Sequence, residues 1–183
     1  LIECKKLTTD PGLREIADEY LEALYSNRIV SIMNSASYTE GEKIQELVYL
    51  QERIFDVLSH PKQKLELSLN ICRKMHNLGY GFRAYQRLEL AFEYVTDIEV
   101  PSAKSYLLYE YAKLIYDIFK APVSRIYMLL SEAGEIAEHL TDINEKIQLS
   151  GAIQILIGKM QNEELLRHAR VANQPPRNWS IFQ

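Results

Sequence analysis

Acidic and imidazole side chains stand four residues apart at two places in the sequence. Glu135 precedes His139 and Glu164 precedes His168, in stretches whose apolar spacing predicts helix, so each pair shares a helical face. Either pair could supply two ligands to a metal ion. A di-metal helical bundle, however, needs Glu-x-x-His spacing on two helices together with further glutamates. Ordinary exposed pairs therefore fit the sequence better than a metal site.

The sequence carries no signature of catalysis or of cofactor binding. It contains no glycine-rich nucleotide motif, no G-x-S-x-G nucleophile turn and no H-E-x-x-H zinc motif. The other two histidines, His60 and His76, are isolated. We therefore expect a protein that is not an enzyme and that has no cofactor and no metal.

Tyrosine is the residue type that most suggests binding, with 12 copies in the chain. Tyr106, Tyr109, Tyr111 and Tyr116 fall in one predicted helix, and Tyr109 and Tyr116, seven positions apart, share a face. Tyrosine is enriched in binding surfaces because it joins an apolar ring to a hydroxyl group. Packing with the hydroxyl at the edge of the core is an equally good interpretation, and Tyr111 lies in the core register.

Composition limits the class of protein. The 183 residues amount to one domain, and 47% hydrophobic with 25% charged residues is enough for a folded core. A net charge of −4 argues against a nucleic-acid surface built on positive charge. No apolar run approaches the roughly 18 residues of a membrane helix. We therefore expect no contact with a membrane. Cys4 and Cys72 lie far apart in the sequence, which favours reduced thiols in a cytoplasmic protein.

The stretch 65–97 predicts a helical hairpin around which the other segments are arranged. Apolar residues recur at helical spacing on both sides of a short glycine-containing turn at 78–81. On the first side these are Leu67, Ile71 and Met75, and on the second side Ala84, Leu88 and Ala91. Small residues in these stripes, Cys72 among them, let two helix backbones approach closely.

Five positions of this hairpin match the tetratricopeptide repeat (TPR) pattern in register. They are Cys72, Gly79, Ala84, Leu88 and Ala91. Ser68 replaces the usual aromatic residue near the start of the first helix, and Thr96 replaces the proline that usually ends the second. The hairpin therefore resembles a TPR, and its long helices are similar to those of kinesin light chain, the Pins/LGN proteins and the Rap and Rgg regulators.

The resemblance implies an all-α, right-handed α-solenoid of antiparallel hairpins with a concave binding face. Carried over by register, the candidate residues are Asn70, Arg73, His76, Asn77, Tyr109, Lys113 and Tyr116, with Glu66, Leu69, Tyr106 and Glu110 beside them. Asn70 matches the family's ligand for a peptide backbone, since an amide both donates and accepts hydrogen bonds. Arg73 would pair with a carboxylate of the ligand. The alternative is that these are ordinary solvated residues.

The remainder of the chain divides into helical segments, about eight in total. Aligning Cys72, Ala112 and Ile153 gives spacings of 112 − 72 = 40 and 153 − 112 = 41 residues. The TPR period is about 34 and HEAT periods are about 40–47, so the spacing favours neither. We expect an N-terminal hairpin over 1–60 that caps the repeats, TPR-like repeats over 61–173 with a separate last helix over 163–172, and an extended tail over 174–183.

The tail follows a helix-stopping Pro175-Pro176 pair and carries Trp179, Ile181 and Phe182. Three large apolar residues in so short a segment predict a contact with something else. The tail either folds back over the end of the solenoid or docks into another protomer or a partner. Docking into another protomer would make a homo-oligomer.

Two functions fit these features. The first is a non-catalytic protein–protein interaction scaffold, an adaptor that holds a protein or peptide partner on its concave face without direct contact to nucleic acid. The alternative is a ligand- or peptide-sensing regulatory domain of a larger signalling or transcription-regulatory protein.

Overall fold

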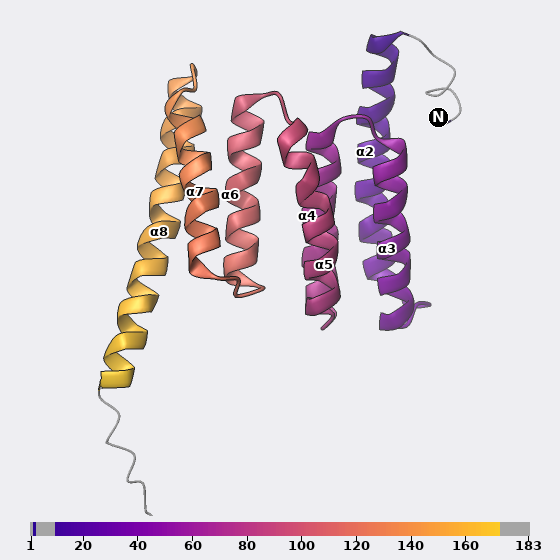
Figure 1. The fold of residues 1–183 in the computed structure, drawn as a ribbon. Coiled ribbons are helices and arrows are strands. Elements are labelled where there is room, and N and C mark those ends of the chain that lie inside the picture. The colour runs from indigo at the N-terminus through magenta and orange to yellow at the C-terminus, as the bar shows by residue number, and fades with distance from the viewer. Residues whose placement is uncertain (1, 3–9, 173–183) are drawn as a thin grey trace, which may run out of the picture.

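All regular structure in the described part of the chain is helical, as expected. The computed structural model describes residue 2 and residues 10–172. The α-helices in this part are α2 (Pro11–Asn34), α3 (Glu40–Val57), α4 (Pro61–Asn77), α5 (Gly81–Phe92), α6 (Pro101–Asp117), α7 (Val123–Glu138) and α8 (Ile143–Ala172). A short 3-10 helix, η1 (Glu93–Asp97), continues α5. Figure 1 shows them as successive pairs in chain order across the molecule, α2 with α3, α4 with α5 and α6 with α7, with α8 at the far side.

Side-chain caps mark the starts of α2 and α3. The Asp10 carboxylate accepts a hydrogen bond of 2.8 Å from the backbone N–H of Gly12, next to a proline at the first helical position of α2. Thr39 and Glu42 form a reciprocal capping box at the start of α3. These contacts satisfy backbone donors that a helix leaves unpaired, and Asp before Pro and Thr-x-x-Glu are both sequence signatures of a helix start.

The last helix differs from the prediction. Residues 143–172 form one continuous helix, so the separate helix expected over 163–172 is wrong. The polar segment Gln161-Asn162 contains neither proline nor glycine and therefore gives the backbone no reason to stop. The Asp142 carboxylate caps the start of α8 by accepting a hydrogen bond of 2.7 Å from the Asn144 N–H.

The predicted hairpin is formed by α4 and α5. Its small residues Cys72, Ala84 and Ala91 are all 0% exposed, which confirms their predicted burial. Burial raises the pKa of the Cys72 thiol to about 12. Gly79 forms the turn with a φ of +87°, a conformation that glycine adopts at little cost.

A polar network joins α5, α6 and α7 beside the core. The Tyr111 hydroxyl donates a hydrogen bond of 2.6 Å to Glu89, and Arg125 lies 2.7 Å from the other oxygen of that carboxylate. Arg125 also donates to the hydroxyl of Tyr85 at 2.8 Å. Desolvation acts to raise the pKa of Glu89, but the hydrogen bonds from Arg125 and Tyr111 outweigh it and hold that pKa below its ordinary value. Burial and then the Glu89 carboxylate raise the pKa of Tyr111.

The helices pack mainly against near neighbours along the chain. The pairs α2–α3, α4–α5 and α6–α7 are antiparallel hairpins, while α2 contacts α4, α4 contacts α6 and α6 contacts α8. The positions aligned from the sequence, Cys72, Ala112 and Ile153, are all buried and lie on α4, α6 and α8. A single apolar core runs through these elements. The row α2, α4, α6 and α8 is the framework on which the candidate site is built.

None of the described helices is long and apolar enough to cross a membrane. The predictions for Cys4 and for the tail over 174–183 concern residues outside the described part.

Candidate functional site

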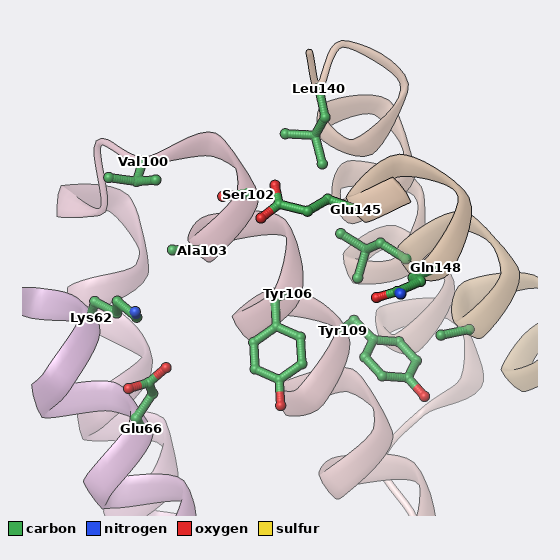
Figure 2. Close-up of a pocket in the computed structure, with 12 residues that line it drawn as sticks. Lys62, Glu66, Val100, Ser102, Ala103, Tyr106, Tyr109, Leu140, Glu145 and Gln148 are labelled. Atoms are coloured by element: carbon green, nitrogen blue, oxygen red, sulfur yellow. The ribbon is translucent and has the colours of Figure 1, made fainter. Parts of the chain in front are cut away.

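A cavity of about 510 Å³ opens between α4, α6 and α8. We call it the tyrosine cavity, because Tyr106 and Tyr109 stand in its centre. Figure 2 shows these two rings between Glu66 of α4 on one side and Gln148 of α8 on the other. Its apolar walls are Val100, Ala103, Leu140, Leu149 and Ala152. Apolar walls with a few polar groups are typical of a binding site.

A second cavity, of about 650 Å³, lies between α2, α4 and the start of α6. We call it the acidic cavity because carboxylates dominate its walls. These are Glu15, Glu19, Glu22, Glu66, Asp97 and Glu99. The two cavities share the walls Lys62, Glu66, Val100 and Ala103, so together they form one groove across the row of first helices.

The environment of the groove raises the pKa of two side chains, Glu66 and Tyr106. Desolvation raises the pKa of Glu66, with Lys62 opposing the shift and Glu22 across the groove reinforcing it. Desolvation also raises the pKa of Tyr106, and the carboxylates of Glu110 and Glu66 add to it. Negative charge is therefore concentrated where water is partly excluded, which makes the groove favourable for a positive group.

Arg73, Tyr109 and Lys113 are the predicted residues that the structure gathers on one surface beside the groove. Arg73 of α4 forms an ion pair with Glu110 of α6, whose other oxygen lies 3.6 Å from Lys113. The Lys113 ammonium lies 5.6 Å from the centre of the Tyr109 ring. Arg73 and Lys113 thus already have an anionic partner within the chain, which reduces their capacity to bind a ligand carboxylate.

Asn70 lies half-buried on α4, between Glu66 and Arg73 along the helix, but it is not a wall of either cavity. Its neighbour Leu69 was expected in the groove. Leu69 is 3% exposed and belongs to the core instead. The register carried over from the TPR resemblance misplaced it, because a helix with neighbours on two sides buries a wider stripe.

His76 and Asn77 lie away from the groove. His76 packs its ring edge against Phe119, with ring centres 5.8 Å apart, in a separate cavity that also touches Gly81 and Phe82. Asn77 is exposed at the end of α4.

Tyr116 is 7% exposed and does not share an open surface with Tyr109. The ammonium groups of Lys120 and Lys159 lie 5.6 and 5.3 Å from its ring centre. Burial and then the Glu163 carboxylate raise its pKa to about 12. Tyr116 is therefore placed as a packing residue between α6 and α8.

Several walls of the groove could not be predicted from the sequence. Gln63, Glu145, Gln148 and the α2 glutamates line it and were not predicted. A signal for α2 exists, since Glu15, Glu19 and Glu22 recur at helical spacing on one face. Nothing in the sequence shows that α2 turns this face toward α4.

The described residues include no group of three or more His, Cys, Asp and Glu placed to hold a metal ion. The groove offers carboxylates, tyrosine hydroxyls and apolar walls. No family model, curated protein or solved structure matches the chain.

Proposed function

We propose that the chain is a non-catalytic, cytoplasmic interaction scaffold, a right-handed α-solenoid of TPR-like hairpins that binds an extended peptide or partner segment in its groove. The observation that carries this proposal is the tyrosine cavity, where two tyrosines of α6 stand among apolar walls from the α6 and α8 regions, with polar walls from α4. An aromatic anchor point inside a groove is where interfaces concentrate their binding energy.

The arrangement of helices supports the same proposal. Three hairpins place their first helices, α2, α4 and α6, in a row, and the residues aligned at spacings of 40 and 41 positions are all buried, on α4, α6 and α8. A groove along such a row suits an extended ligand, because each hairpin adds further contacts.

The alternative, a sensing domain of a larger regulatory protein, draws on the same cavity. Its 510 Å³ lies within the usual size of about 300–1,000 Å³ for small-ligand pockets. Binding of a small molecule, with no peptide able to compete for the cavity, would favour this function.

Peptide selection tests the scaffold proposal directly. A random dodecapeptide library displayed on phage would be panned on the immobilised chain, and recovered peptides measured by calorimetry. The variant Tyr106→Ala/Tyr109→Ala should weaken their affinity about tenfold or more, as loss of aromatic anchors does at interfaces.

The control variant is Tyr20→Ala/Tyr49→Ala. It removes two exposed tyrosines of α2 and α3 that line neither cavity. Recovered peptides should bind this variant as they bind the wild type. Peptides that bind the Tyr106→Ala/Tyr109→Ala variant with wild-type affinity would contradict the proposal, as would a selection that recovers none.

A further inference from the structure

The charge of the groove is unbalanced, and the imbalance points to the chemistry of its partner. The acidic cavity has six carboxylates in its walls and, against them, Lys62 and His60. Among the described residues, none of the six carboxylates forms an ion pair within 4 Å. These carboxylates therefore remain available to a cation from outside.

A buried acceptor in the same wall points the same way. Gln63 is 9% exposed and lines the acidic cavity, and its side-chain oxygen is buried without a hydrogen-bond partner. An unsatisfied buried acceptor is costly, so a ligand that donates a hydrogen bond here gains more than one that only fills space. Lysine and arginine side chains are donors without acceptors.

Glu66 connects this chemistry to the tyrosine cavity because it is a wall of both spaces. Its raised pKa shows that the site disfavours a bare negative charge, and Glu22 adds to that effect. A positive group near Glu66 would offset both the desolvation of this carboxylate and its repulsion by Glu22. Directly beside it, the aromatic and aliphatic walls of the other cavity suit an apolar side chain.

Resting on the proposed function, we infer that the partner is an extended basic segment of another protein, which places a lysine or arginine in the acidic cavity and a neighbouring large apolar side chain in the tyrosine cavity. Because the two cavities share a wall, the basic and the apolar side chain must lie only a few residues apart along the segment in order to reach both spaces. A segment carrying acidic residues is disfavoured, since its charge would meet the same carboxylates.

The peptide selection tests this inference through the composition of the recovered sequences. Lysine and arginine should be enriched within a few residues of a leucine, phenylalanine, tyrosine or tryptophan. Affinity for such peptides should fall about tenfold or more in Glu19→Gln/Glu22→Gln, as expected for lost charge-assisted hydrogen bonds.

The matched control is Glu93→Gln/Glu132→Gln. It removes the same charge from exposed glutamates that line neither cavity, and it should leave affinity within about twofold of wild type, as for rim charges. A uniform loss in both variants would mean that overall charge, rather than the acidic cavity, attracts the peptide, and would overturn the inference.

The outcomes separate this inference from the proposed function. Neutral or acidic peptides that still depend on Tyr106 and Tyr109 would overturn the basic partner and leave the scaffold standing. Basic peptides that lose affinity only in the Glu19→Gln/Glu22→Gln variant would place binding in the acidic cavity alone and overturn the paired anchor. Recovery of no peptide would contradict both proposals.

Discussion

Glu89 is a carboxylate that the fold keeps charged. It accepts a hydrogen bond from the buried Tyr111 and pairs with Arg125, and these contacts lower its pKa. A carboxylate with a lowered pKa in the folded state stabilises the fold above its unfolded pKa of about 4.3, and this contribution is lost as the pH falls through the folded value.

Comparison of Glu89→Gln with the wild type should therefore show a pH-dependent difference. The wild type should have the larger free energy of unfolding at pH 7, and this advantage should shrink steadily below about pH 4.3. Urea unfolding at a series of pH values measures it. The control Glu132→Gln removes an exposed carboxylate outside the network and should differ little from wild type throughout. A Glu89→Gln difference that stays constant with pH would contradict the role given to the network.

Individual residues show how far the sequence could predict the site. The buried places of Cys72, Ala84 and Ala91 were predicted correctly because they depend on packing inside one hairpin. Tyr116 and Leu69 were expected at an open surface and are buried, since their environment is set by helices distant in sequence. Periodicity identifies a face of a helix, but not the helix that will cover it.

At the scale of the element, the turn between α4 and α5 depends on its glycine. Gly79 has a φ of +87°, and a Cβ added there would meet nothing within 4 Å. The cost of a side chain is therefore purely one of backbone conformation.

The substitution Gly79→Ala should lower the free energy of unfolding by about 1 kcal/mol, the usual cost of the left-handed region for a residue with a Cβ. Gly134→Ala in α7 is the opposing control, because that site is equally open but helical, and alanine should stabilise it by about 0.5–1 kcal/mol. Thermal or urea unfolding of both variants decides the matter. Stabilisation by both substitutions would show that the turn does not need its glycine.

Element boundaries were the most predictable part of the fold. Local chemistry starts α2 and α3 at Asp10 and Thr39, and both caps were readable from the sequence. The continuous α8 was not predicted, because a polar segment looks like a break even when no proline, glycine or cap ends the helix. The length of α8 depends on the absence of a stop signal and not on the polarity of the segment.

Across the whole molecule, contacts join mainly helices that are one or two places apart in the chain. We expect stability in such an arrangement to be divided into local parts that open separately. A mildly destabilising substitution at one end of the molecule should therefore have little effect on the local stability of the other end.

The matched pair Ile44→Val and Ile153→Val tests this expectation. Both isoleucines are buried, on α3 and α8, and each substitution should destabilise its surroundings by about 0.5–1.5 kcal/mol. Native-state hydrogen exchange should show lost protection in α2 and α3 for the first variant and in α7 and α8 for the second. Equal loss along the whole chain in either variant would mean that the molecule opens as one unit.

The buried thiol of Cys72 has a consequence for chemical modification. Oxidants and alkylating agents react with the thiolate, and this sulfur is both sealed from solvent and held protonated by a pKa of about 12. The Cys72 thiol is therefore unreactive while the protein remains folded. Any adduct found on Cys72 records an occasion on which the core around α4 opened, so the rate at which adducts accumulate measures how often this part of the core opens.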